Sequence, residues 1–112
     1  MDGTNAVETG KHTHHLKSWP KPFADLSGGR RTYELRINDR NYRMGDRLVF
    51  HEWSPTGQGF TGAWVIADVV HVSTAESYDG VLAGMLGENV ACLGLNVRAG
   101  GFNPDFVIPG VR

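Results

Sequence analysis

Residues 30–40 contain polar side chains at alternating positions that could together bind an anion or a nucleobase. Glu34, Arg36 and Asn38 place a carboxylate, a guanidinium and an amide at every second position. Since successive strand side chains point to opposite faces, these three share one face of a predicted strand. We expect the other face to lie in the core and the polar face to meet a ligand; a solvated strand with an ion pair is the alternative. The apolar residues are Tyr33, Leu35 and Ile37.

Basic residues are concentrated in the first half of the chain. Nine of the eleven Lys and Arg residues lie between Lys11 and Arg47, where four acidic residues leave a local charge of about +5 on a chain of net charge -1. From Leu48 onward, only two basic residues face six acidic ones. Such asymmetry favours a local positive surface suited to phosphate-bearing partners, although the charges could also scatter over solvated faces.

Polar residues of neighbouring segments are expected to gather beside this strand. The planar guanidinium fork suits phosphates and base edges, and aromatic rings can stack on unpaired bases. Asp39 and Asp46 are expected to hold the loop that follows the strand. The predicted nucleic-acid-binding residues are Lys17, Arg31, Glu34, Arg36, Asn38 and Arg40. The aromatic residues that could stack are Trp19, Trp53, Phe60 and Trp64.

Catalysis and metal binding find less support in the sequence. Glu34, Lys17 and Glu52 are the candidate catalytic residues, but no serine lies in a Gly-x-Ser-x-Gly elbow. The single Cys92 lies in an apolar run, which predicts a buried thiol rather than a nucleophile. A histidine cluster at residues 12–15 lacks the further ligands of a zinc site, so we predict no metal and no cofactor.

Hydrophobic periodicity predicts several short strands and one short helix. The helix covers residues 19–27, where prolines are tolerated in the first turn and Gly28-Gly29 ends it. The segment 73–89 could be either a helical turn or a packed loop. The predicted strands span residues 13–17, 32–38, 48–53, 61–72 and 90–97. This pattern is typical of a mainly β (α+β) protein, and we predict a small β-barrel with one short helix after the first strand.

The length of 112 residues fits one domain. We predict a domain at residues 13–98, a disordered leader at 1–12 and a tail at 99–112. No apolar run is long enough to cross a bilayer, so no membrane partner is expected. A lone cysteine is typical of a reducing compartment, which predicts a cytoplasmic protein, and we expect a monomer.

A series of motifs resembles a bacterial and phage family of small uncharacterised proteins within the ASCH superfamily, whose fold is similar to the PUA domain. The resemblance spans roughly residues 14–97. It implies a PUA-like β-barrel with a cleft that binds RNA or modified nucleotides. The motifs are His14-x-Leu16-Lys17, Thr32-x-Glu34-x-Arg36, Asn38-Asp39-Arg40 and Gly45-Asp46-x-Leu48.

Some ASCH relatives are amidohydrolases that remove an acetyl group from acetylated cytidine with a Lys, a Thr and a Glu. The resemblance places Arg31 and Glu34 at the Lys and Thr positions. An arginine stays protonated near pH 7 and cannot serve as a base, so we do not expect that activity here. The favoured hypothesis is a non-catalytic RNA- or nucleotide-binding module. The alternatives are a hydrolase with Glu34 or Glu52 as general base, and a surface that binds a partner protein.

Overall fold

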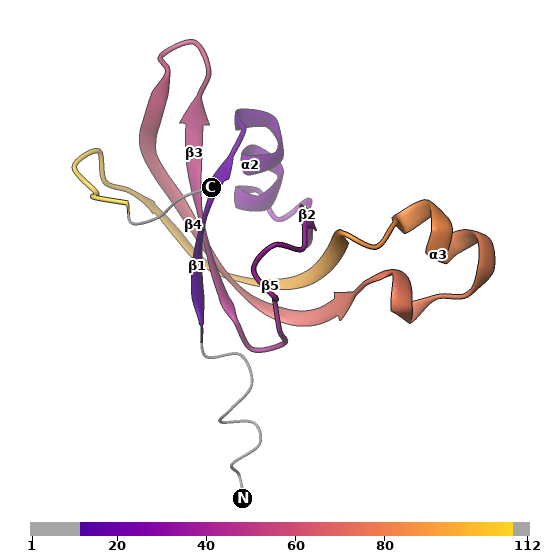
Figure 1. The fold of residues 1–112 in the computed structure, drawn as a ribbon. Helices are drawn as coiled ribbons and strands as arrows, with labels where there is room; N and C mark the ends of the chain where they lie inside the picture. The colour runs from indigo at the N-terminus through magenta and orange to yellow at the C-terminus, as the bar shows by residue number, and fades with distance from the viewer. Residues whose placement is uncertain (1–11, 109–112) are drawn as a thin grey trace, which may run out of the picture.

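The computed structural model describes residues 12–108, so all of the predicted leader except His12 lies outside the described residues. The described part is mainly β, as predicted (Figure 1). No helix within it is long and apolar enough to cross a membrane. In chain order the elements are β1 (Thr13–Ser18), α2 (Pro20–Ser27), β2 (Tyr33–Ile37), β3 (Arg47–Ser54), β4 (Gly59–Ser73), the 3-10 turn η1 (Ala75–Ser77), α3 (Gly80–Leu86) and β5 (Val90–Phe102).

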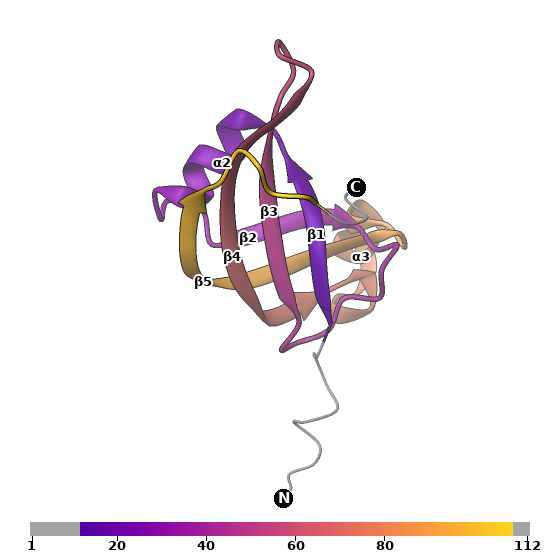
Figure 2. The same cartoon turned by 90° about the vertical axis from the view of Figure 1, so that its left-hand side faces the viewer.

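The five strands form one curled sheet with the order β1-β3-β4-β5-β2. β1 and β3 run parallel, and every other neighbouring pair is antiparallel. The long strands β4 and β5 shift register twice, between Ile66 and Ala67 and between Val69 and His71. Such irregularities bend a strand. The sheet thus forms a half-barrel in which β2 and β5 cross behind β1, β3 and β4 (Figure 2).

Two elements differ from the sequence prediction. The strand predicted over residues 90–97 continues to Phe102, so residues 99–102 belong to the sheet rather than to a tail. Glycines weaken a strand pattern, but here Gly101 permits close packing, since a Cβ there would lie 2.5 Å from the Trp64 ring. The segment 73–89, for which both a helical turn and a packed loop were considered, contains η1 and α3, so the protein has a second short helix besides the one predicted after the first strand.

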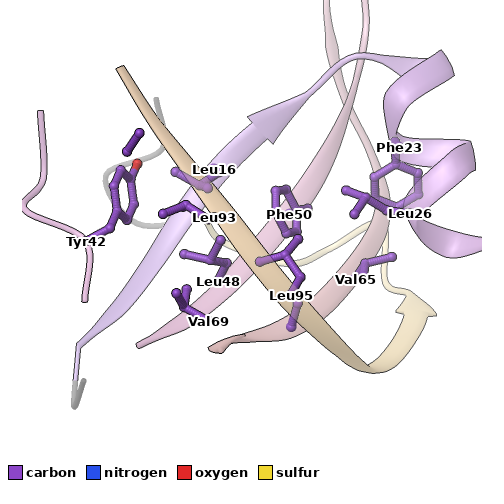
Figure 3. Close-up of a cluster of buried hydrophobic side chains, with 12 residues drawn as sticks. Leu16, Phe23, Leu26, Tyr42, Leu48, Phe50, Val65, Val69, Leu93 and Leu95 are labelled. Atoms are coloured by element: carbon purple, nitrogen blue, oxygen red, sulfur yellow. The ribbon is translucent and has the colours of Figure 1, made fainter. Parts of the chain in front are cut away.

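The core fills the inside of the half-barrel and is covered at one end by α2 (Figure 3). Pro20 begins α2, where its fixed φ suits the first turn, and Phe23 and Leu26 lie three residues apart on the buried side. Their burial holds the helix against the sheet, because a helix of eight residues is marginal alone. The core side chains from the strands include Leu16, Leu48, Phe50, Val65, Val69, Leu93 and Leu95.

β2 lies in the sheet with the opposite face inward from the one predicted. Its apolar side chains Tyr33, Leu35 and Ile37 are 52–60% exposed, whereas Glu34 is buried. Glu34 and Arg36 pair across the ladder with Leu93 and Ala91, which are both core residues. The period-2 pattern therefore identified the two faces of the strand correctly, but the polar face is the one turned into the half-barrel.

Candidate functional site

A cleft of about 470 Å³ opens between the end of β1, the start of α2, and β2 with the loop after it. This volume lies within the usual range of small-molecule sites. Apolar Leu16 and Pro22 contribute to its wall beside the polar residues. The lining residues that can carry charge or form hydrogen bonds are Lys17, Ser18, Trp19, Arg31, Glu34, Arg36, Asp39, Arg40 and Tyr42.

Most of the residues predicted for nucleic-acid binding line this cleft, and Asn38 is the exception. Asn38 is exposed, and its backbone N–H donates to the Asn89 carbonyl at 2.7 Å. Glu52, a candidate general base, is also outside the lining. Its carboxylate accepts a hydrogen bond from the Thr61 hydroxyl at 3.0 Å. The structure therefore brings together the polar groups of β1 and β2 but not those of β3.

Glu34 is the centre of the charged wall of the cleft. Its side chain is only 8% exposed, and each of its carboxylate oxygens accepts a hydrogen bond from an arginine. The Arg31 Nη2 contacts Oε1, and the Arg36 Nε donates to Oε2 at 2.6 Å. A buried carboxylate needs such partners, and two guanidinium groups supply them. These ion pairs explain how the polar face of β2 can be turned inward.

Arg36 and Arg40 also link the two edges of the half-barrel. The Arg36 Nη2 donates to the Lys17 carbonyl at 2.6 Å, and the Arg40 Nη1 donates to the His15 carbonyl at 3.3 Å. These carbonyls are two residues apart on β1, an edge strand whose single strand neighbour in the sheet is β3. Since carbonyls at alternate positions point to the same side, both lie on the open edge. The guanidinium groups thus supply hydrogen-bond donors to β1 carbonyls that a neighbouring strand would otherwise pair with.

Arg31 is positioned by the turn that follows α2. Gly29 adopts a φ of +78°, which an L side chain rarely adopts, and the Arg31 N–H then donates to the Asp25 carbonyl at 3.0 Å. The guanidinium lies 5.1 Å from the centre of the Tyr33 ring. Its Nη2 contacts Glu34, but its Nη1 is buried and has no hydrogen-bond partner among the described residues.

Lys17 contributes to the cleft differently from the prediction. Its ammonium nitrogen lies 4.8 Å from the centre of the Trp53 ring. Trp53 does not line the cleft. Along β1, Lys17 alternates with the buried residues Leu16 and Ser18, so its side chain leaves from the opposite face. Its carbonyl, which accepts the bond from Arg36, is the group that faces the open edge.

Tyr42 is a cleft residue that the sequence argument missed. It is buried, and its ring meets the His14 ring edge-on at a centroid distance of 4.8 Å. Burial raises the pKa of the Tyr42 hydroxyl, and the positive charges of Arg36 and Arg40 oppose that rise. The residue before it, Asn41, has a φ of +52°, a conformation in which asparagine is enriched. Asn41 was the available signal for the turn, but nothing in the sequence marked Tyr42 as the residue that turns inward.

Asp46 holds the loop between β2 and β3 from a fully buried position. Its Oδ2 accepts hydrogen bonds from the His14 Nε2 at 2.8 Å and the Arg43 backbone N–H at 3.0 Å. Its Oδ1 accepts a longer bond from the His12 backbone N–H at 3.3 Å. One carboxylate thereby fastens the loop to β1, the strand that supplies one side of the cleft.

The outer face of the half-barrel carries a second histidine contact. The His15 Nδ1 and the His51 Nε2 are 2.9 Å apart, and the Phe106 ring covers His51 at 5.3 Å. His14 and His15 lie on opposite faces of β1. Burial, together with the adjacent His15, lowers the pKa of His51 to about 4, and burial also lowers the pKa of His15. Within residues 12–108, no three His, Cys, Asp or Glu side chains gather closely enough to hold a metal ion.

We expect acid to destabilise the protein partly through His51. Its pKa is about 4 in the folded chain and near 6.5 when unfolded, so the unfolded state binds more protons between these values. The stability contributed by neutral His51 is therefore complete above pH 7 and lost toward pH 4, by on the order of 2 kcal/mol. Urea unfolding at pH 7 and pH 4.5 measures this loss. The loss of stability between pH 7 and pH 4.5 should be smaller in His51→Gln than in the unmodified protein. An equal loss in the two proteins would contradict the assignment to His51.

Comparison with known proteins supports the resemblance to a phage family. The family model described as "Domain of unknown function (DUF3850)" matches residues 13–85, which include β1, α2, β2 and the whole cleft. An Escherichia phage P2 protein described as "Uncharacterized 12.9 kDa protein in GpA 3'region" is 41% identical over 61 residues. That alignment covers 54% of this chain and 53% of the phage protein, so the chain spans about half the length of this relative. The chain belongs to the DUF3850 family.

Proposed function

We propose that the cleft binds RNA or a nucleotide and that the protein is a binding module rather than an enzyme. Three guanidinium groups, those of Arg31, Arg36 and Arg40, line the cleft together with two carboxylates. Planar guanidinium groups in a partly buried site can donate paired hydrogen bonds to phosphates and to base edges. The concentration of positive charge in the first half of the chain supports the same ligand class.

The observation that carries this proposal is the unpaired donor of Arg31. Its Nη1 is buried without an acceptor among the described residues, and an unsatisfied buried donor costs about 1–3 kcal/mol. The other terminal nitrogen of Arg31 is held by Glu34. An oxygen of a bound ligand, such as a phosphate oxygen or a base carbonyl, would satisfy this donor.

Trp19 gives the cleft an aromatic surface for a base. Its side chain is 52% exposed although it lines the cleft beside Pro22. The other aromatic residues considered from sequence lie elsewhere: Trp53 packs edge-on against Phe60 at 5.0 Å, and neither lines the cleft. A stacked base contributes about 1–3 kcal/mol of binding free energy, and stacking tolerates any base. We therefore expect little sequence preference from this contact.

The geometry favours binding over hydrolysis. A general base must be within hydrogen-bond reach of the proton that it removes. Both oxygens of Glu34 already accept hydrogen bonds from arginines. Glu52 lies outside the cleft and is bonded to Thr61. The alternative of a hydrolase that uses either glutamate therefore gains no support from these contacts.

We also propose that the family lies within the ASCH superfamily and that the curled sheet is a PUA-like fold. A short helix directly after the first strand, and a polar cleft between that helix and the sheet, support this assignment. We propose a cytoplasmic location as well, because the single Cys92 cannot form a disulfide within this chain.

Binding of a single-stranded RNA oligonucleotide, measured by fluorescence anisotropy, tests this function. Three phosphate contacts predict a slope near -2 for log affinity against log salt, so affinity should fall about 20-fold from 50 to 200 mM NaCl. Arg36→Ala should weaken binding at least tenfold. It should also make the slope shallower by about 0.7, the amount expected for the loss of one phosphate contact. The matched control Arg98→Ala removes a surface arginine paired with Asp68 and should change affinity less than about twofold.

Trp19→Ala provides a variant that tests binding without touching the buried ion pairs. Loss of a stacked base should weaken binding by about 5- to 150-fold while leaving the salt slope unchanged. Equal losses in Arg36→Ala and Arg98→Ala, or no effect of Trp19→Ala, would contradict binding in this cleft. Circular dichroism of each variant establishes that the fold is retained.

A further inference from the structure

We propose that a second copy of this chain covers an apolar face formed by β2, α3 and Tyr78, which lies between η1 and α3, making the protein a homodimer. The inference concerns the outward side of β2, where Leu35 and Ile37 also contribute to the lining of the cleft. Because β2 turns its polar residues inward, its apolar residues are left on the outer surface. The apolar face consists of Tyr33, Leu35, Ile37, Tyr78, Leu82 and Met85, which are each 44–76% exposed.

The apolar face contains a groove of about 390 Å³. Leu35 and Cys92, which are paired across the β2–β5 ladder, line its floor beside Tyr78. Leu82 and Met85, three residues apart on α3, form its wall. The sequence pattern had predicted a core position for Cys92, but the thiol is half-buried in this groove.

α3 lacks the packing that normally stabilises a short helix. It spans seven residues, none of them buried, and it projects from the half-barrel at the end of the β4–β5 hairpin (Figure 1). Isolated helices of this length are marginal in water, and most helical stability comes from burying an apolar face. A surface that packs against Leu82 and Met85 would supply this stabilisation.

The size and composition of the apolar face favour a second copy as the occupant. Its side chains expose on the order of 700 Å², close to the roughly 800 Å² that each partner contributes to a standard interface. None of them is charged, and α3 itself contains no charged residue, so two copies can meet without like charges opposed at the centre. Such apolar interfaces are characteristic of homodimers rather than of transient partners.

The segments of this chain outside the described residues fit the apolar face poorly. Residues 1–11 contain only three apolar side chains, Met1, Ala6 and Val7, among charged and polar ones. Residues 109–112 contain Val111 and end in Arg112. Neither segment offers apolar area comparable to that of the face.

Sedimentation equilibrium of the full chain tests the proposal. We expect a monomer–dimer equilibrium with a dissociation constant at or below micromolar concentration. Met85→Glu or Leu82→Glu places a charge in the interface and should raise that constant by roughly 30-fold or more. The matched control Val107→Glu adds the same charge at an exposed site in the C-terminal segment and should leave it unchanged.

The thiol of Cys92 gives a second measurement in the unmodified protein. It is the chain's only cysteine and it lines the groove, so its labelling by a thiol reagent should slow as the concentration rises through the dissociation constant. In Met85→Glu the labelling rate should be independent of concentration. A chain that is monomeric at 100 µM would overturn the proposal, leaving a foreign protein as the occupant. A dimer that persists in both glutamate variants would also overturn it.

Discussion

Replacing Glu34 with glutamine is expected to lower the free energy of unfolding by about 3 kcal/mol. Its carboxylate is 8% exposed and is the shared partner of Arg31 and Arg36, whose side chains are 15% and 21% exposed. Glutamine keeps the size but removes the charge, and it turns an NH2 group, which only donates, toward one of the two arginines. Two partly buried guanidinium groups would then lose the carboxylate that they share. Breaking a buried ion pair on one side typically costs 3–5 kcal/mol, and the residual exposure of the arginines reduces that figure.

The Glu34→Gln substitution should also weaken the contact between the two edge strands of the half-barrel. Arg36 also donates to the Lys17 carbonyl, so a displaced guanidinium would loosen the link between β1 and β2. Urea unfolding measures the change, and Glu76→Gln, at an exposed glutamate of η1, is the control with an expected effect below about 0.5 kcal/mol. If both variants unfolded at the same urea concentration, Glu34 would not be the counter-ion that allows the polar face of β2 to be buried.

Asp46→Ala is expected to destabilise the protein by a similar amount, about 3–4 kcal/mol. The substitution leaves the buried His14 imidazole and the part-buried backbone N–H groups of Arg43 and His12 without their acceptor. Each unsatisfied buried donor costs about 1–3 kcal/mol, and relaxation of the loop recovers part of the total. Asp46→Asn retains one acceptor oxygen and should lose about half as much stability.

Asp68 offers a matched control for Asp46. It also has two arginine partners, Arg47 at 3.4 Å and Arg98 at 3.1 Å, but these side chains are more than half exposed. Surface ion pairs contribute about 0–1 kcal/mol, so Asp68→Ala should have a small effect on thermal unfolding. Comparable losses in Asp46→Ala and Asp68→Ala would show that burial of the loop carboxylate is not the source of its contribution.

The sequence predicted the strands and the first helix well because their signals are local. Period-2 alternation, the paired prolines before Phe23 and the glycines after Ser27 correspond to β1, α2 and β2. The second helix was not resolved, since α3 contains two glycines and buries none of its residues. A short helix without a buried face leaves little periodic signal.

The orientation of β2 could not be read from its pattern. Alternation identifies two faces, and the usual rule places the apolar one inward. Here the rule failed because Glu34 satisfies two arginines and Arg36 also satisfies a carbonyl of β1. These contacts join residues up to 19 positions apart, so only the folded chain reveals them. The cleft was nevertheless foreseen in outline, since the same polar face supplies its charged wall.

Side-chain NMR of the arginines tests most directly whether the inward polar face of β2 meets a ligand. The Nε–Hε signals of Arg31, Arg36 and Arg40 report on the cleft, and those of Arg47 and Arg98 report on the outer surface. On titration with a single-stranded RNA oligonucleotide, we predict shifts of the three cleft signals that saturate together, with the other two unchanged. Shifts confined to Arg47 and Arg98, or no shifts at saturating RNA, would contradict the proposed site.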